Sequence, residues 1–220
     1  MAAIESRPPA SAPPRLTVVD HPLVASRLTL LRNQDSGPEN FRRALQELSI
    51  LLLAEAARSW SVSAIEIETP LQTAPGAILT RRVTFVPILR AGLGMLDGML
   101  QLVPDALVGH IGLYRDEITL RPVSYYSRLP KNIAPTEVLV LDPMLATGHS
   151  ACEAVRMVKA QGVESVQFVC VVACPAGLAQ FQQAHNDVPI VTAAIDPELN
   201  QFGYIVPGLG DAGDRYFGTG

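Results

Sequence analysis

The sequence has little charge, few aromatic side chains and only three cysteines. Charged residues make up 17% of its 220 positions and aromatic residues 5%, whereas hydrophobic residues make up 48% and the mean hydropathy is +0.23. Such a composition excludes a wholly disordered or highly charged solvating chain, because it offers enough apolar surface to build a core. At this length, one substantial core is expected without disulfide or metal cross-links.

Long apolar runs are also absent. No segment reaches the ~18 uninterrupted apolar residues of a membrane span, since Glu47 and Glu55 break the longest helical candidate and Gln167 flanks the best strand. Residues 1–10 contain no basic stretch followed by an apolar one, so no secretory signal is recognised. We therefore expect no membrane partner and a cytoplasmic location.

Cysteine and lysine are too scarce for two common kinds of site. Cys152, Cys170 and Cys174 are not spaced like a zinc knuckle or a redox pair, and free buried thiols are expected. Lys131 and Lys159 are the only lysines, the net charge is −4 and the isoelectric point is near 5.6. Nonspecific nucleic-acid binding needs a basic face, so no nucleic-acid partner is expected. An anionic small molecule would instead be held by particular arginines, a metal ion or helix N-termini.

The chain divides into a short tail and one long domain. Residues 1–15 hold four prolines, few large apolar groups and no periodicity, which predicts a disordered tail. Residues 16–220 are predicted to form a single domain, because they contain no repeat and no linker. Two amphipathic helices are predicted at its start, over residues 22–32 and 38–56, each beginning at a proline.

Beyond Val62, short strands rich in β-branched residues alternate with helical patterns. Ile65 and Ile67 alternate with glutamates, which suits a half-exposed strand, and a sheet edge is one place for it. Buried strands are predicted over residues 83–88, 106–113, 138–141, 166–172 and 190–195. Crossover helices are predicted over residues 93–102, 151–161 and 175–184. This alternation predicts an α/β fold with a mainly parallel, doubly wound sheet flanked by helices, which binds ligands at the carboxyl ends of its strands.

A strand, an acidic residue, a short loop and a helical run follow one another over residues 138–161. The loop at Ala146–Ser150 would direct backbone N–H groups and the hydroxyls of Thr147 and Ser150 at one spot beside a helix N-terminus. Such a spot suits a phosphate, although the lysine and the spacing of a nucleoside-triphosphate loop are missing. Asp142 precedes the loop, where a carboxylate can accept hydrogen bonds from sugar hydroxyls. Phosphate beside a diol indicates a ribose 5-phosphate.

The loop after the first buried strand admits two interpretations. Arg90 could hold a diphosphate, because Gly92 and Gly94 would let the backbone approach a bulky anion. The same Gly-x-Gly, with Gly98 one position late and Asp116 about twenty residues on, imitates a dinucleotide-binding fingerprint. A nicotinamide-dependent oxidoreductase is therefore an alternative on this pattern alone.

Three segments carry a likeness to a known family. Residues 142–150, Asp-Pro-Met-Leu-Ala-Thr-Gly-His-Ser, resemble the phosphoribosyl-diphosphate signature of type I phosphoribosyltransferases, and their Asp-Pro start resembles the uracil phosphoribosyltransferase family. Residues 86–95 and 200–214 resemble the same family, and the likeness runs from about residue 16 to the end. His149 departs from it, because the family commonly has a second glycine there. The histidine either strains the loop or adds a side chain at the phosphate rim.

The resemblance implies the type I phosphoribosyltransferase fold, with a small C-terminal hood that binds the base and a flexible flap at residues 114–128. The residues implied to contact the donor, 5-phospho-α-D-ribose 1-diphosphate (PRPP), are Arg90, Arg115, Asp142, Pro143, Met144, Leu145, Ala146, Thr147, Gly148, His149, Ser150 and Asp211. Those implied to contact uracil, mostly through main-chain groups that suit its polar edge, are Ile205, Gly210, Asp211 and Ala212. Asp211 and Arg115 are implied to be catalytic. Asp214 is expected either to brace the loop or to pair with Arg215.

The resemblance also implies a reaction and its partners. Ribose 5-phosphate would pass from PRPP to uracil, giving UMP and diphosphate in pyrimidine salvage. Mg²⁺ is the implied cofactor, held mainly by PRPP rather than by protein side chains. A homo-oligomer, dimer or tetramer, is implied, and GTP is known as an effector of some relatives. An RNA-binding attenuator of pyrimidine genes on the same fold is the alternative, which the acidic isoelectric point and the two lysines disfavour.

Overall fold

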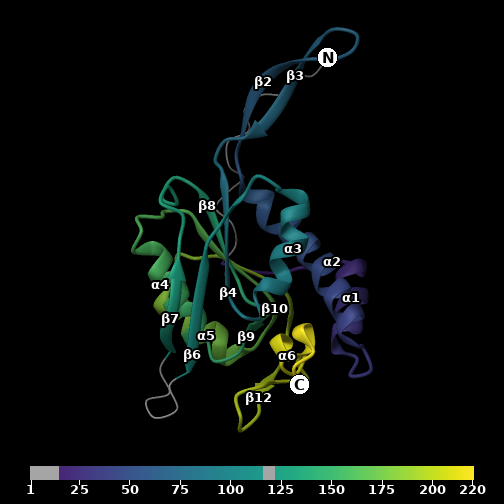
Figure 1. Cartoon of the computed structure of the whole chain (residues 1–220), viewed down its shortest axis with the longest axis vertical. Coiled ribbons are helices and arrows are strands. Elements are labelled where there is room, and N and C mark those ends of the chain that lie inside the picture. The colour runs from purple at the N-terminus through teal and green to yellow at the C-terminus, as the bar shows by residue number, and fades with distance from the viewer. Residues whose placement is uncertain (1–14, 116–121) are drawn as a thin grey trace.

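The computed structural model describes residues 15–115 and 122–220 (Figure 1). It consists of a central sheet with helices on both faces and a two-stranded arm that extends away from the body. The predicted tail lies outside the described residues except for Arg15, whose carbonyl accepts a hydrogen bond from the Ile190 N–H at 3.0 Å. Residues 116–121 of the expected flap also lie outside them.

The central sheet has nine strands, of which seven lie in the order β1-β11-β10-β8-β4-β6-β7, while β5 pairs with β4 and β9 with β10. All of these pairings are parallel except the antiparallel pair of β6 and β7. The strands are β1 (Leu16–Val18), β4 (Val83–Leu89), β5 (Leu107–Val108), β6 (His110–Arg115), β7 (Pro122–Arg128), β8 (Glu137–Leu141), β9 (Met144–Leu145), β10 (Val166–Ala173) and β11 (Ile190–Ile195). The predicted mainly parallel sheet is confirmed.

Helices α1 to α5 follow the predicted segments closely, whereas η1 and α6 were not predicted. Three of them, α1, α2 and α5, begin with a proline in the first turn, where its missing N–H costs nothing. The helices are α1 (Pro22–Arg32), α2 (Pro38–Ala56), η1 (Ala57–Ser59), α3 (Leu93–Leu102), α4 (His149–Lys159), α5 (Pro175–Ala184) and α6 (Ala212–Phe217). No helix among the described residues is both long and apolar enough to cross a bilayer.

Two hydrophobic cores cover the two faces of the sheet, because successive strand residues point to opposite sides. Leu139 and Leu141 of β8 pack in the core that includes α1, α2, α3 and α6. Val138 and Val140 of the same strand pack in the core that includes α4 and α5. The sheet is therefore wound on both sides, as the alternation of strands and helices predicts.

A β-bulge in β10 marks the end of the sheet where the candidate site lies. The N–H groups of Val171 and Val172 both donate to the Pro143 carbonyl at 3.0 Å, so two residues of β10 face one of its neighbour. After the bulge the alternation changes phase, because Val172 joins the same core as Val171 and Ala173 joins the opposite one. The bulge lets β10 pair with β8 and then with β9 across the bend at Pro143.

Several expectations about the strands were wrong. The strand predicted over residues 106–113 is split into β5 and β6 around Gly109. The half-exposed strand β2 (Val62–Glu68) is not at the edge of the central sheet; it pairs with β3 (Thr73–Leu79) and forms the projecting arm (Figure 1). The sequence did not reveal β3, whose Pro75 and Gly76 are poor strand formers. It also did not reveal β7 or the short pair β12 (Glu198–Leu199) and β13 (Ile205–Val206).

Gly98 of α3 packs directly on the backbone of α2, because a Cβ at this position would collide with the Gln46 carbonyl. We expect Gly98→Ala to lower the free energy of unfolding by about 1–3 kcal/mol, the usual cost of overpacking, although alanine is the better helix former. Urea denaturation measures the change. The matched control is Gly37→Ala, where an added methyl group would meet nothing within 4 Å. An unchanged or higher stability of Gly98→Ala would contradict this close helix contact.

Candidate active site

Two adjoining cavities lie at the carboxyl ends of the central strands, beside the C-terminal segment. The first, of about 230 Å³, is lined by Ala91, Asp142, Met144, Ala146, Gly203, Tyr204, Ile205, Gly210, Asp211, Ala212 and Gly213. The second, of about 360 Å³, is lined by Leu89, Arg90, Ala91, Leu113, Tyr114, Tyr125, Asp211 and Gly213. Ala91, Asp211 and Gly213 belong to both linings, so a ligand in one cavity would be next to a ligand in the other.

The predicted phosphate loop ends at Gly148, the N-cap of α4, whose φ of +82° lies in the left-handed region. A Cβ there would lie 2.9 Å from the Gly177 carbonyl oxygen, so both conformation and space require glycine. The first-turn N–H groups of an α-helix have no partners within the helix, and no side chain caps α4. The start of this 11-residue helix therefore offers N–H groups to an anion, as the sequence predicts.

The underside of this loop is held by the start of α5. A Cβ on Gly177 would collide with the carbonyls of Leu145 and Ala146, which shows how closely α5 approaches. The Cys174 thiol lies 3.0 Å from the Ala146 carbonyl and donates to it. Sequence reasoning missed both supporting residues, and the only signal was a glycine two positions into a helix that begins at Pro175.

His149 is the first residue of α4, and its side chain is exposed. Its backbone is helical, and the left-handed conformation is adopted by Gly148 instead. Of the two expectations for the departure at His149, strain in the loop is wrong, because a helical position does not require glycine. The histidine therefore adds a side chain to the rim of the loop.

Asp142 follows β8 directly and lines the first cavity. Burial raises the pKa of its carboxyl from 3.8 to about 7, against the opposing effect of the Met144 N–H, which donates to its Oδ1 at 3.3 Å. A carboxyl with such a pKa changes its charge near neutral pH. Its position at the carboxyl end of a strand, beside the loop that leads to α4, is the one that the sequence predicts.

Arg90 follows β4 and lines the second cavity. Its Nη2 lies 2.8 Å from Oδ1 of Asp214, and its guanidinium carbon lies 5.7 Å from the centre of the Phe217 ring. Hydrogen bonds from Thr219 and Arg90 lower the pKa of Asp214. The expected pair of Asp214 with Arg215 is therefore wrong, because the side chain of Asp214 points at the loop after β4.

The glycines after Arg90 allow close packing within the protein, Gly92 against strand backbone and Gly94 against helices. A Cβ on Gly92 would collide with the Leu141 carbonyl, and a Cβ on Gly94 would lie 2.5 Å from Leu45 and 2.7 Å from Tyr216. At both positions, the space that a side chain would occupy is therefore filled by other atoms of the protein. The expectation that Gly92 and Gly94 bring the backbone close to an anion is wrong for this reason, and the dinucleotide-binding interpretation loses the glycines on which it depended.

Asp211 connects the two cavities and caps α6. Its Oδ1 accepts a hydrogen bond from the Asp214 N–H at 2.8 Å, which orients the carboxylate at the boundary of the two linings. Ile205, Gly210 and Ala212 line the first cavity beside it, so the structure brings the four residues predicted for the base into one place. Tyr204 also lines this cavity and was missed, although an aromatic residue in a glycine-rich segment was a visible signal.

Some predicted donor-site residues lie elsewhere or outside the described part. The backbone of Arg115 ends β6, but its side chain lies outside the described residues. Pro143, Leu145 and residues 147–150 line neither of the two cavities and form the loop and helix start next to them. Within residues 15–115 and 122–220, no three His, Cys, Asp or Glu side chains come together as a metal site.

Comparisons with known proteins show which family the chain resembles over most of its length. Residues 18–219 match the family model described as uracil phosphoribosyltransferase. Two relatives with that name come from Dictyoglomus thermophilum, 55% identical over 92% of this chain and 98% of the relative, and from Alkaliphilus oremlandii, 53% identical over 93% and 99%. The solved structure of the AQ2163 protein from Aquifex aeolicus is similar with a TM-score of 0.88 and 38% identity, over 93% of this chain and 98% of that one.

The raised pKa of Asp142 predicts a pH-dependent cost in stability. Since its folded pKa of about 7 exceeds the ordinary 3.8, the unfolded chain binds fewer protons than the folded one between these values, and stability falls as pH rises through this window. We therefore expect Asp142→Asn to stabilise the protein relative to wild type more at pH 8 than at pH 5, as measured by urea denaturation.

The matched control is Asp187→Asn. A hydrogen bond from Lys159 lowers the pKa of Asp187, so the stability that it contributes is fully present above its unfolded pKa and is equal at pH 5 and pH 8. A difference between Asp142→Asn and wild type that is the same at both pH values would contradict the assigned burial of the carboxyl.

Proposed function

The chain belongs to the uracil phosphoribosyltransferase family, and from this premise we propose that its adjoining cavities transfer ribose 5-phosphate from PRPP to N1 of uracil, giving UMP and diphosphate. The observation that carries the proposal is the shared lining of the cavities. Asp211 and Ala91 stand where a donor beside Arg90 would meet a base beside Ile205. This role belongs to pyrimidine salvage, and we expect it in the cytoplasm.

The donor would be held by three groups of residues. The loop from Ala146 to Ser150 and the start of α4 would bind its 5-phosphate through backbone N–H groups and hydroxyls. The carboxylate of Asp142 would accept hydrogen bonds from the ribose hydroxyls. Arg90, and Arg115 by family resemblance, would bind the diphosphate with charge-assisted hydrogen bonds.

Uracil would be recognised by the main chain of the C-terminal segment. Its edge alternates C=O and N–H groups, which suits the N–H and C=O groups of Ile205, Gly210 and Ala212. These residues line the first cavity, and Asp211 faces the same space. Backbone recognition needs no particular side chain, so the fixed position of the segment must supply the selectivity.

Catalysis would be electrostatic and positional. The bond between C1 of the ribose and the diphosphate oxygen breaks, the C1–N1 bond forms, and N1 of uracil loses its proton. Arg90 and Arg115 would stabilise the charge that gathers on the diphosphate. Asp211, at the boundary of the two cavities, would orient uracil and help to remove the N1 proton.

Mg²⁺ is the cofactor that we propose for this site. When bound it would neutralise part of the charge of the diphosphate. Asp142 and Asp211 are the carboxylates in the linings of the two cavities, and oxygen ligands of this kind fit the ion or its water shell. With two carboxylates on the protein side, most ligands of the ion would come from PRPP and water.

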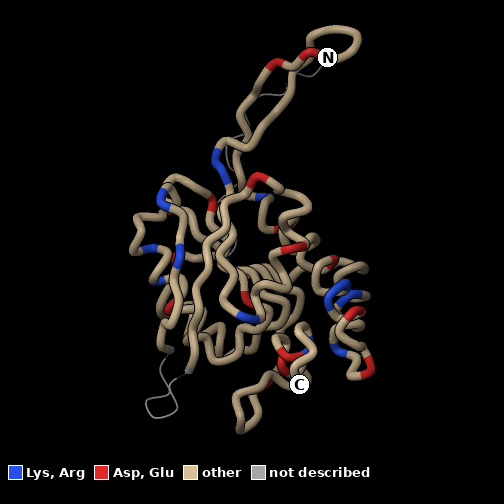
Figure 2. The backbone as a smooth tube through the Cα atoms, in the orientation of Figure 1, with Lys and Arg blue, Asp and Glu red and all other residues tan. Residues whose placement is uncertain are grey.

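The RNA-binding alternative would need a continuous basic surface. Figure 2 shows the lysine and arginine positions distributed over several elements and interspersed with aspartate and glutamate positions. We therefore propose the enzymatic role. A GTP effector stays a prediction of the family resemblance, and no residue is assigned to it.

A nucleobase panel with PRPP and Mg²⁺ tests the reaction. We expect UMP from uracil and no product from cytosine or hypoxanthine.

Loss of a charged contact to the donor costs roughly 1.5–3 kcal/mol, so Asp142→Asn and Arg115→Ala should each lower kcat/KM at least tenfold. The matched control is Arg58→Ala, whose exposed side chain on η1 lines neither cavity. Near-normal kinetics in both site variants would contradict the assignment, and no UMP from wild-type protein would overturn the function.

The projecting arm carries our proposal for the oligomer. An isolated two-stranded hairpin is marginally stable in water, and this arm exposes Leu71 to 95% and Ile78 to 52%. We propose that the arm packs against a second copy of the chain, which would cover these exposed apolar side chains.

Analytical ultracentrifugation of a Leu71→Asp/Ile78→Asp variant tests the arm. We expect wild type to sediment as a dimer or tetramer and the variant to shift toward the monomer. Leu23→Asp, which changes an exposed residue on α1, is the control. A monomeric Leu23→Asp with an oligomeric arm variant would place the interface on the N-terminal helices instead.

A further inference from the structure

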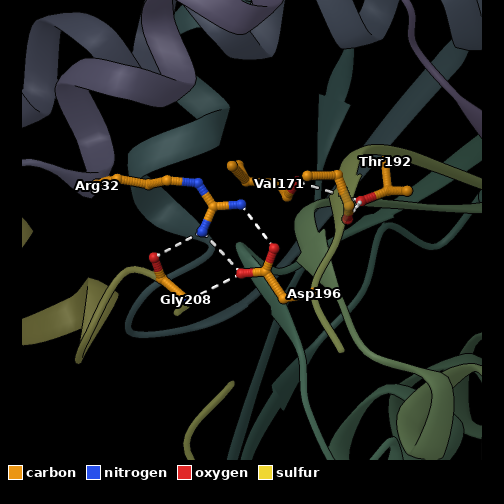
Figure 3. A network of polar contacts seen from close by, with 6 residues as sticks. Arg32, Val171, Thr192, Asp196 and Gly208 are labelled. Atoms are coloured by element: carbon orange, nitrogen blue, oxygen red, sulfur yellow. Dashed lines mark hydrogen bonds and ion pairs between the residues drawn. The ribbon is translucent and has the colours of Figure 1, made fainter. Parts of the chain in front are cut away.

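A partly buried ion pair, in which the Arg32 side chain is 26% exposed, lies behind the segment that faces the first cavity (Figure 3). Arg32 is the last residue of α1, and Asp196 follows β11. Nη1 and Nη2 of Arg32 lie 2.7 Å from Oδ2 and Oδ1 of Asp196, which is a bidentate pair. The side chain of Asp196 is only 6% exposed. Neither residue lines either cavity.

The ion pair holds both main-chain groups of Gly208. The Gly208 N–H donates to Oδ2 of Asp196 at 2.8 Å, and Nη1 of Arg32 donates to the Gly208 carbonyl at 3.0 Å (Figure 3). Burial opposes the ionisation of Asp196, but its hydrogen bonds with Arg32 and Gly208 outweigh that effect and lower its pKa. Gly208 lies in the chain between Ile205 and Gly210, both of which line the first cavity.

Gly208 is also the tightest point of this turn. Its φ is +58°, and a Cβ would collide with the Ile205 carbonyl. Only glycine therefore fits the observed shape of the turn at this residue, and the ion pair holds that shape relative to the end of α1. A displacement of Gly208 would move the main chain of Ile205 and Gly210 with it.

The strand that carries Asp196 is itself fixed. The Asp196 N–H donates to the Ala173 carbonyl of β10 at 2.8 Å. The Thr192 hydroxyl is buried and lies 3.2 Å from the Val171 carbonyl and 3.1 Å from the Ala194 carbonyl (Figure 3). The carboxylate thus projects from the central sheet, and the ion pair joins the sheet, α1 and the cavity-facing segment.

Arg215 adds a second connection to the same end of α1. Its guanidinium donates to the carbonyls of Leu31, Leu209 at 2.9 Å and Asn33 at 2.7 Å. It also lies 4.4 Å over the ring of Phe41. Hydrogen bonds of Arg32 and Arg215 therefore connect two consecutive residues of the cavity-facing segment, Gly208 and Leu209, to the end of α1.

We propose that Arg32 and Asp196 are positioning residues that set the affinity for the base by fixing Gly208. The proposal rests on the proposed function, in which the main chain of Ile205, Gly210 and Ala212 binds uracil. Main-chain recognition requires donors and acceptors at fixed places, and an unfixed segment would have to be ordered at the expense of binding free energy. The ion pair orders the segment before the base arrives.

The proposal predicts a selective effect on one substrate. Arg32→Lys keeps the charge but loses the fork that contacts both oxygens of Asp196 and the Gly208 carbonyl. We expect it to raise KM for uracil about tenfold or more, with KM for PRPP and kcat within about threefold of wild type, because uniform binding of one substrate is lost. Asp196→Asn should act in the same direction. Steady-state kinetics with each substrate varied in turn measures the split.

The control is Arg27→Gln. Arg27 also lies on α1 and pairs with a glutamate, Glu47 of α2, at 2.7 Å, but it does not contact the cavity-facing segment. The Arg27→Gln variant loses an ion pair of α1 but keeps the contacts of Gly208, so its KM values for uracil and PRPP should be those of wild type. All assays are run well below the thermal midpoint of each variant.

A double variant covers the case in which a single change prevents folding. Removing one partner of a buried ion pair leaves an uncompensated charge, whereas replacing both by apolar residues is often tolerated. Arg32→Met/Asp196→Leu should therefore fold and show the same selective rise in KM for uracil. A folded single or double variant with wild-type KM for uracil, or with equal rises for both substrates, would overturn the proposal. Absence of uracil transfer in the wild type would instead overturn the proposed function.

Discussion

The proposed function makes recognition by backbone groups the constraint on which the rest of the structure depends. The phosphate loop and the base segment both present main-chain N–H and C=O groups, and such groups discriminate only if the chain that carries them cannot move. Close packing supplies this at Gly148, where the start of α5 leaves no room for a side chain. At Gly208 the same rigidity comes from the ion pair of Arg32 and Asp196. The two arrangements are different, but each fixes the main chain of a segment that is proposed to bind substrate.

Rigid loops alone would not bring the two substrates together. In the proposed function, that contact depends on Asp211, which caps α6 and lines both cavities. The ion pair of Arg90 and Asp214 joins the loop after β4 to the first turn of the same short helix. The loop after β4, which is proposed to bind the diphosphate of the donor, and the base segment are therefore both attached to α6. Figure 1 shows α6 at the end of the sheet opposite the projecting arm.

The sequence predicted the elements whose signals are local. The strand Ile190–Ile195 and the helices Leu93–Leu102 and Pro175–Ala184 were predicted at their observed bounds, because β-branched runs, prolines and glycines mark them. Contacts between distant residues have no local pattern, so the pair of Arg32 with Asp196, 164 positions apart, was missed. For Asp214, bracing of the loop or a pair with Arg215 was expected; consecutive helical residues do not face each other, and Arg90 is the partner of Asp214.

A crystal structure of the protein with bound UMP tests the central claim most directly. We expect the nucleotide phosphate at the backbone of residues 146–150, the ribose hydroxyls at Asp142, and the pyrimidine edge against the main chain of Ile205, Gly210 and Ala212. A nucleotide bound at any other place, with the loop before α4 and the Gly208 segment both free of ligand, would contradict this account.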